Sequence, residues 1–333
     1  MTPFKFFPGP VRGILTLVIN LINTIFWSTP LFILTLLKFL VPIPAFRRFC
    51  TRVLHGLVSH WVAVNNFTQR LFCDTRWEVT GVENLQPDGW YLVVANHQTW
   101  VDILVLQRVF NRRIPLLTFF IKKELIWVPL LGQAWWALEF PFMKRYSTAY
   151  LKRHPQKRGK DIEATQKACE KFKHQPIAVM NFIEGTRFTP EKHRRSASPY
   201  ANLLRPKAGG MALVLATVGR QLHRILDVTI VYPDGPKTFW EFACGKIERI
   251  HVQVDQIPVT DHLIGDYIAD RTFKRQFQAW LNDLWIKKDQ RIVAVLAAAQ
   301  NASGTAKRHC DPSEDRCREE LLSNPRKVAQ NAP

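Results

Sequence analysis

The chain has 333 residues, enough to bury one large hydrophobic core or two modest ones. Lysine and arginine outnumber aspartate and glutamate by 46 to 27, and this net charge of +19 indicates an anionic partner: nucleic acid, a membrane surface or a phosphorylated substrate. The six cysteines are scattered without a pair at metal-binding spacing, which argues against a disulfide framework and for reduced thiols in a cytoplasmic compartment.

The first long segment is apolar enough to enter a membrane. No charged residue lies between 13 and 37, and only Lys38 interrupts the apolar run before Val41. A bilayer core requires about 20 residues, so we predict a membrane anchor over 1–50, either a helical hairpin broken near Pro30 or a single span. Basic residues flank the segment on both sides and do not select an orientation, and the hairpin with both ends cytoplasmic is preferred. A buried helix of a soluble protein is the alternative.

The remainder of the chain divides into a link, an α/β domain and a tail. Residues 51–75 have the apolar spacing of an amphipathic linking helix. Strands then alternate with helices, which predicts an α/β sheet domain over 76–290. Predicted strands lie at 77–81, 90–95, 115–120, 177–183, 227–232 and 246–254, and predicted helices at 100–110, 161–175, 211–217 and 267–288. Residues 291–333 turn Ala-rich and then charged, which predicts a disordered tail.

The stretch 96–102 contains the strongest chemical signal. It follows the predicted strand at 90–95, so His97 and Asp102 lie at the carboxyl end of a strand, where open α/β sheets place their ligands. Residues five apart on a helix point about 140° apart, so these two side chains meet only if the chain turns between them. Asp102 could then fix the imidazole tautomer while the other ring nitrogen takes a proton. Alternatively, Thr99 and Asp102 form a capping box with a purely structural role.

Polar residues also follow the predicted strand at 177–183. In the run Glu184-Gly185-Thr186-Arg187, the glycine lets the backbone approach a ligand and the arginine can grip phosphate in a bidentate fork. Between the two strands lies an apolar, Trp-containing segment, which is either core or a wall of an apolar groove. Lys123 and Arg145 flank this segment and are either solvated surface or part of a phosphate-binding rim.

Taken together, these blocks resemble the glycerophospholipid acyltransferase family typified by 1-acyl-glycerol-3-phosphate (lysophosphatidic acid) acyltransferase. The resemblance is closest to the branch that contains the enterobacterial inner-membrane probable acyltransferase, and it covers roughly residues 75–235. The block 96–102 matches the family's catalytic motif, and 182–187 matches its third block in full. Lys123 and Arg145 lie in a match to the second block, and 230–233 is a weaker match to the fourth.

The resemblance implies a mixed sheet with flanking helices and a membrane-bound enzyme. Such an enzyme transfers a fatty acyl chain from acyl-CoA or acyl-carrier protein to the sn-2 hydroxyl of lysophosphatidic acid. His97 would be the general base and Asp102 would orient it. The implied substrate-binding residues are Lys123, Arg145, Glu184, Gly185, Thr186 and Arg187, with Glu184 positioning Arg187 or the glycerol hydroxyls.

Further expectations concern partners and location. The thioester chemistry needs no metal, and no cofactor is expected. Anionic membrane lipids are expected partners, and the active site is expected on the cytoplasmic side of a bacterial inner membrane. Another lysophospholipid such as lysophosphatidylglycerol is the alternative acceptor. A membrane-tethered nucleic-acid binder is a remote alternative, but the basic residues are dispersed without a recognisable binding motif, so no nucleic acid is expected.

Overall fold

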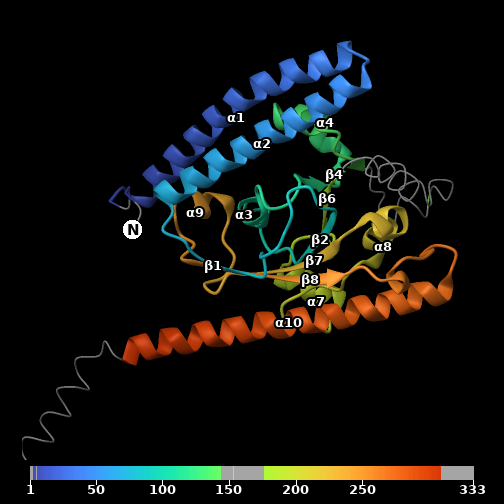
Figure 1. Cartoon of the computed structure of the whole chain (residues 1–333). Helices are drawn as coiled ribbons and strands as arrows, with labels where there is room; N and C mark the ends of the chain where they lie inside the picture. Colours follow the sequence, from blue (N-terminus) through green and yellow to red (C-terminus); the bar gives the residue numbers. More distant parts are fainter. Residues whose placement is uncertain (1–2, 5, 144–152, 154–175, 309–333) are drawn as a thin grey trace, which may run out of the picture.

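The centre of the protein is a six-stranded mixed sheet with the strand order β1-β8-β7-β2-β6-β3 (Figure 1). The structure is a computed structural model that describes residues 3–4, 6–143, 153 and 176–308. The strands are β1 (Arg76–Thr80), β2 (Tyr91–Ala95), β3 (Leu117–Phe119), β6 (Ala178–Phe182), β7 (Arg224–Val231) and β8 (Arg249–Pro258). β2 pairs in parallel with both β6 and β7, whereas β8 is antiparallel to β7. The expected mixed α/β sheet is therefore confirmed.

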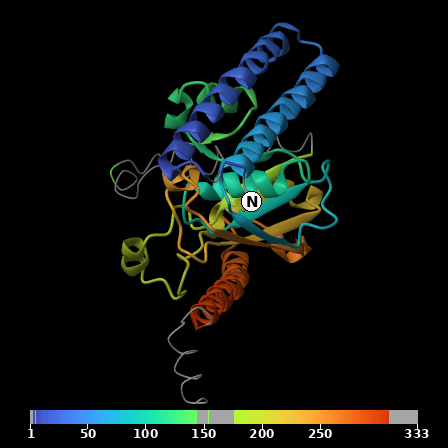
Figure 2. The same cartoon turned by 90° about the vertical axis from the view of Figure 1, so that its left-hand side faces the viewer.

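Helices cover both faces of this sheet (Figures 1 and 2). Helices α3 (Val101–Phe110) and α9 (Phe239–Ala243) lie on one face, and α8 (Ala208–Val218) and α10 (Arg271–Arg308) lie on the other. Residues of β2 alternate between the two cores: Tyr91 and Val93 pack on the α3 side, and Leu92 and Val94 pack on the α8–α10 side. Burial on both faces explains why this strand is apolar throughout.

Shorter elements complete the described part of the domain. A small parallel sheet consists of β4 (Ile121–Lys122) and β5 (Phe142–Met143). Between these strands lie the 3-10 helix η1 (Lys123–Trp127) and the helix α4 (Leu131–Ala137). The others are α7 (Pro190–Ser196), η4 (Gly219–Gln221) and η5 (Asp261–Leu263).

Two long helices, α1 (Gly9–Leu40) and α2 (Pro44–Phe72), form an antiparallel pair outside the α3–α9 layer (Figure 1). By length and composition α1 could cross a membrane. The predicted break near Pro30 is wrong, because α1 continues through this residue and the chain reverses only after Leu40. A proline keeps a helical φ and removes one backbone hydrogen bond, so it weakens a long helix without having to end it. Residue 50, the predicted end of the anchor, lies inside α2.

The interface between α1 and α2 contains polar contacts beside apolar ones, whereas the outer surface of α1 is apolar. The side-chain amide of Asn23 donates to Oδ1 of Asn65 at 2.8 Å and to the carbonyl oxygen of Trp61 at 3.0 Å. The indole of Trp61 donates to the hydroxyl of Thr24 at 3.1 Å. The exposed apolar side chains of α1 include Ile14, Leu17, Leu21, Ile22, Ile25, Phe26, Ile33, Leu36 and Phe39. Polar contacts between helices and apolar outer surfaces are typical of helices in lipid.

Helix α1 touches the rest of the chain near both of its ends. Near its start, Gly13 packs on α9 so closely that an added Cβ would lie 2.7 Å from Sγ of Cys244. Near its end, Nζ of Lys38 lies 2.7 Å from Oε1 of Glu139, just beyond α4. The helix therefore lies along the domain and does not project from it.

Helix α10 is longer than the sequence predicted. The disordered tail expected from residue 291 is wrong for 291–308, because the helix continues to Arg308. Alanine is the strongest helix former, and Ile292 is buried against the core, so the Ala-rich stretch extends the helix. The rest of the predicted tail (309–333), the predicted helix at 161–175 and the candidate residue Arg145 lie outside the described residues.

A buried ion pair fixes α10 to β7. Nζ of Lys288 lies 2.8 Å from Oδ1 of Asp227, and both side chains are completely buried. Nζ of Lys288 also donates to the carbonyl oxygen of Val228 at 2.5 Å. Because a buried charge is costly unless it is paired and hydrogen-bonded, these contacts hold α10 in one position on the sheet.

Candidate functional site

The chain turns between β2 and α3, and this turn brings His97 and Asp102 together. Nδ1 of His97 lies 2.8 Å from Oδ2 of Asp102, so the contact that the sequence predicted is confirmed. An ionised carboxylate only accepts hydrogen bonds, so Nδ1 carries the hydrogen and Nε2 is the basic nitrogen. The His97 side chain is 12% exposed and that of Asp102 is 1% exposed. The imidazole is therefore reachable, while the carboxylate is enclosed.

Asp102 also organises the backbone of the turn. Its Oδ2 accepts hydrogen bonds from the backbone N–H groups of Gln98 at 2.6 Å and Thr99 at 3.0 Å. The bond from Thr99 N–H is one half of the alternative capping box. The hydroxyl of Thr99 instead donates to the carbonyl oxygen of Lys237 at 2.6 Å. Asp102 therefore stabilises the start of α3 in addition to contacting His97.

The strands on either side of β2 complete the surroundings of these two side chains. From the end of β6, the ring of Phe182 stacks on the imidazole of His97, with centroids 3.9 Å apart and planes inclined by 14°. Just after β7, the hydroxyl of Tyr232 donates to Oδ1 of Asp102 at 2.7 Å. The sequence analysis assigned no role to either residue. The available signal was their position at the ends of predicted strands, where parallel pairing brings side chains to one edge of the sheet.

Burial keeps Tyr232 in its neutral, donating form. The side chain is almost completely enclosed, and this burial raises the pKa of its phenol well above 10. The negative charge of Asp102 and the hydrogen bond to it raise the pKa of Tyr232 further, because phenolate beside carboxylate is repelled.

Asn96 fastens the turn to β7. Its side-chain amide donates to the carbonyl oxygen of Ile230 at 2.9 Å, and its Oδ1 accepts from the N–H of Ile230 at 2.9 Å. This reciprocal pair imitates a strand ladder at the point where the main chain leaves the sheet. The backbone just before His97 is therefore held in place on β7.

The buried carboxylate of Glu184 links two separate segments of the chain, one at His97 and one at Leu204. Its Oε1 accepts from the backbone N–H of His97 at 3.0 Å, and its Oε2 accepts from that of Leu204 at 2.9 Å. The residue is 1% exposed, and burial raises the pKa of its carboxyl group to about 7 despite the two hydrogen bonds that favour ionisation. Both carboxylate oxygens accept hydrogen bonds from backbone amides of other segments, and the expected role of Glu184 in positioning Arg187 or the glycerol hydroxyls stays a prediction.

Gly185 and Thr186 lie close to two lysines from later in the chain, Lys192 in α7 and Lys207 at the start of α8. Gly185 has φ +70°, and a Cβ built there would lie 3.1 Å from Nζ of Lys207. Nζ of Lys192 donates to the hydroxyl of Thr186 at 2.8 Å. Neither lysine was among the site residues predicted from the sequence. The fold brings their charges to the carboxyl end of β6.

Arg187 lies beside the turn that holds His97 and Asp102. Its guanidinium carbon is 4.8 Å from the ring centroid of Trp100, which belongs to the stretch between His97 and Asp102. Both side chains are exposed, and such a cation–π contact limits where the guanidinium can lie. Lys123 is also exposed, at the start of η1, and its predicted role in substrate binding stays a prediction.

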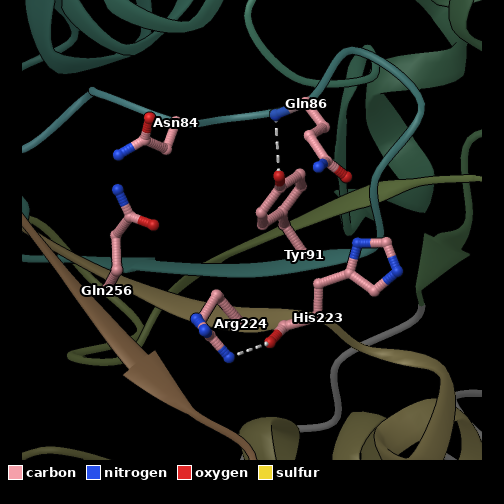
Figure 3. A pocket seen from close by; sticks show the side chains of 6 residues that line it. All are labelled: Asn84, Gln86, Tyr91, His223, Arg224 and Gln256. Carbon is pink, nitrogen blue, oxygen red and sulfur yellow. Dashed lines mark hydrogen bonds between the residues drawn. The ribbon is translucent and has the colours of Figure 1, made fainter.

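A shallow cavity of about 500 Å³ lies at the opposite end of the sheet (Figure 3). Its lining comprises Asn84, Gln86, Tyr91, His223, Arg224 and Gln256. Tyr91 and Arg224 are the first residues of β2 and β7, whereas His97 follows the last residue of β2. This cavity is therefore separate from the turn that holds His97 and Asp102.

Comparison with known proteins shows that the central part of the chain is similar to acyltransferases. Residues 76–233 match the family model described as Acyltransferase. A 1-acyl-sn-glycerol-3-phosphate acyltransferase of Saccharomyces cerevisiae is 34% identical over 140 residues, 41% of this chain and 42% of that protein. In Arabidopsis thaliana, 1-acyl-sn-glycerol-3-phosphate acyltransferase 3 is 26% identical over 222 residues, 60% of this chain and 52% of that protein.

A solved structure is also similar to this chain. The crystal structure of the 1-acyl-sn-glycerophosphate (LPA) acyltransferase PlsC from Thermotoga maritima aligns with a TM-score of 0.45 and 18% identity. The alignment covers 85% of this chain and 98% of that chain. The chain spans about half the length of the two relatives named above.

Proposed function

Because residues 76–233 match the Acyltransferase family model and resemble 1-acyl-sn-glycerol-3-phosphate acyltransferases, we propose that the chain transfers a fatty acyl chain from an acyl thioester to the sn-2 hydroxyl of lysophosphatidic acid, giving phosphatidic acid. The observation that carries this proposal is the hydrogen bond between His97 and Asp102 on a partly exposed imidazole at the carboxyl end of a parallel strand. The thioester donor is acyl-CoA or acyl-carrier protein.

In the proposed reaction His97 is the general base. Its Nε2 takes the proton of the acceptor hydroxyl as that oxygen attacks the thioester carbonyl carbon. The tetrahedral intermediate then collapses, the carbon–sulfur bond breaks, and the proton passes from the imidazolium to the departing thiolate sulfur. Asp102 stabilises the imidazolium, and Phe182 and Tyr232 hold the pair in place. The steps balance without a redox partner.

The acceptor's phosphate binds where positive charge gathers beside His97. Arg187 is the residue best placed to hold it, because its guanidinium is exposed and lies against Trp100 in the catalytic turn. Lys192 and Lys207 add positive charge over Thr186 and Gly185. Lys123 and Arg145 are also proposed to bind this phosphate.

The protein works on a membrane, proposed to be the cytoplasmic side of a bacterial inner membrane. Its 32-residue α1 is about 48 Å long, with apolar side chains on its outer surface. Because α1 contacts α9 near its start and Glu139 near its end, the helix lies in the plane of the membrane surface in this arrangement. This in-plane position differs from the spanning anchor expected from the sequence, and it leaves the active site beside the lipid.

The test is acyl transfer by the full-length protein in vesicles, with a panel of lysophospholipids offered with acyl-CoA and with acyl-carrier protein. We expect phosphatidic acid from lysophosphatidic acid, and a loss of at least a thousandfold in His97→Ala. His223→Ala is the matched control, since this exposed histidine lies at the opposite end of the sheet. Product formed only from lysophosphatidylglycerol would show that this lipid is the acceptor, and the mechanism at His97 would be unchanged. Equal activity in His97→Ala would contradict the mechanism.

A further inference from the structure

Two tryptophans project from the segment between β4 and β5, outside the site described above. Trp127, at the end of η1, is 82% exposed, and Trp136, in α4, is 58% exposed. Trp127 is the most exposed large apolar side chain among the residues that the structure describes. Exposed apolar surface of this size marks a contact with something other than water.

The segment that carries these tryptophans is tightly packed. At Gly132, the start of α4, an added Cβ would lie 2.2 Å from the carbonyl oxygen of Ile126 in η1, so the two helices touch through their backbones. The side chain of Gln133 donates to the same carbonyl oxygen at 3.2 Å. Trp127 and Trp136 are therefore displayed by a well-ordered unit, and their exposure does not come from a loose loop.

The same unit lies against α1. Ala137 is buried in a cluster with Leu31 of α1 and Leu54 of α2. Just beyond α4, Glu139 forms its ion pair with Lys38 at 2.7 Å. Figure 1 shows α4 beneath the end of the helix pair at which the chain reverses. The outer surface of α1 at this end is apolar, with Ile33, Leu36 and Phe39 exposed. The unit that carries the tryptophans therefore packs beside the part of α1 whose outer surface suits lipid.

Charge indicates which part of a bilayer this segment would meet. Lys122, which has no part in the proposed function, is exposed where the segment begins. Tryptophan favours the headgroup level of a membrane, where its ring is buried and its N–H stays hydrated, and lysine favours anionic lipids.

We propose that the η1–α4 unit is a second membrane contact, which inserts Trp127 and Trp136 at the headgroup level of an anionic bilayer beside the in-plane helix α1. This proposal rests on the membrane attachment in the proposed function. It assigns the tryptophans to lipid and not to the acyl-transfer chemistry.

The test uses the full-length protein in phosphatidylcholine–phosphatidylglycerol vesicles whose acyl chains carry bromine, a contact quencher of tryptophan emission. The chain has 11 tryptophans, so the readout is the bromine-sensitive share of the emission. We expect Trp127→Phe/Trp136→Phe to lower this share at least twofold. Bromines near the glycerol backbone should quench the wild type more than bromines near the chain ends. Trp280→Phe, a partly buried tryptophan of α10, is the matched control and should leave the share unchanged.

An unchanged bromine-sensitive share in the double variant, with the protein bound to the vesicles, would overturn the proposal. Stronger quenching by bromines near the chain ends would also overturn it, because the rings would then lie below the headgroups. Protein that does not float with the vesicles would remove the membrane attachment as well. Since the readout is not catalysis, quenching in a protein without acyl transfer would leave this proposal standing and reject the proposed function.

Discussion

Tyr232 and His97 hold the same carboxylate from opposite sides. The phenol of Tyr232 donates to Oδ1 of Asp102 at 2.7 Å, while Nδ1 of His97 donates to Oδ2 at 2.8 Å. Tyr232 follows β7 and His97 follows β2, so the hydrogen bonds link two neighbouring strands at their carboxyl ends. The orientation of the imidazole therefore depends on Tyr232, which lies 130 positions after Asp102 in the chain.

Replacing Tyr232 by phenylalanine should slow acyl transfer roughly tenfold, because Oδ1 of Asp102 loses its donor and the carboxylate can rotate away from His97. The free energy of unfolding should fall by about 1–3 kcal/mol, as expected when a buried acceptor is left unpaired. Steady-state kinetics and chemical denaturation measure the two effects. Tyr91→Phe is the matched control: this buried tyrosine also has one hydrogen bond, at 2.9 Å from the N–H of Gln86, but lies at the other end of β2. Equal rates in the two variants would show that Tyr232 is not a positioning residue.

The buried carboxyl group of Glu184 should make stability depend on pH. Burial raises its pKa from 4.5 to about 7, so between these values the folded protein holds more protons than the unfolded chain. The contribution of Glu184 to the free energy of unfolding is thus fully present below about pH 4.5 and is lost as the pH rises to about 7. In Glu184→Gln the side chain is neutral throughout, so this slope should vanish.

Denaturation followed by circular dichroism at several values between pH 5 and 8 measures the slope. As the pH rises to about 7, the free energy of unfolding of the wild type should fall relative to that of Glu184→Gln. Above about pH 7 the difference between the two proteins should stay constant. Replacing the exposed Glu83 by glutamine is the control and should leave the wild-type slope in place. Parallel curves for wild type and Glu184→Gln would show that the carboxyl group is ionised throughout this range.

The contact between Arg187 and Trp100 should affect substrate binding more than chemistry. Replacing Trp100 by leucine removes the aromatic ring 4.8 Å from the guanidinium, so Arg187 is less restrained and KM for lysophosphatidic acid should rise about three- to fivefold. The kcat should change less than twofold, because Trp100 does not contact the imidazole. Trp100→Phe keeps a ring and should restore most of the affinity. The same KM in both variants would mean that the ring does not position Arg187.

The polar interface between α1 and α2 should stabilise the helix pair. Asn65→Leu leaves the amide of Asn23 with one partner fewer, which should cost about 1 kcal/mol of the free energy of unfolding. Thermal unfolding in detergent, followed by circular dichroism, measures this loss. Thr29→Ala is the control, because this exposed hydroxyl bonds only to Ile25 of its own helix. A greater loss in Thr29→Ala than in Asn65→Leu would contradict the interpretation of the interface.

The sequence predicted the parts of the site that depend on local order. The buried strand before His97 and the helix after it required a turn, and a turn of that length brings Asp102 to the imidazole. The contacts of Phe182 and Tyr232 were not predictable in this way, because they depend on which strands flank β2. Strand order is set by packing over the whole sheet, so the spacing of residues along the sequence does not reveal it.

Misinterpretations arose where local preference competes with surrounding structure. Pro30 favours a helix end, but α1 continues because its packing on α2 extends on both sides of the proline. The family resemblance implied that Glu184 positions Arg187 or the glycerol hydroxyls. Two backbone N–H groups without other partners accommodate its carboxylate inside. The length of α10 was underestimated because charged, Ala-rich sequence was taken as disorder, although alanine favours helix.

Under the proposed function, the attachment of α1 along the domain also determines how substrate would reach His97. A domain attached near both ends of an in-plane helix would not tumble, so His97 would stay at a constant height above the lipid. An acceptor with one acyl chain then arrives by lateral diffusion, a search in two dimensions. The rate of such an enzyme follows the mole fraction of acceptor within the bilayer, and diluting the surface with inert lipid slows it even when the bulk concentration is unchanged.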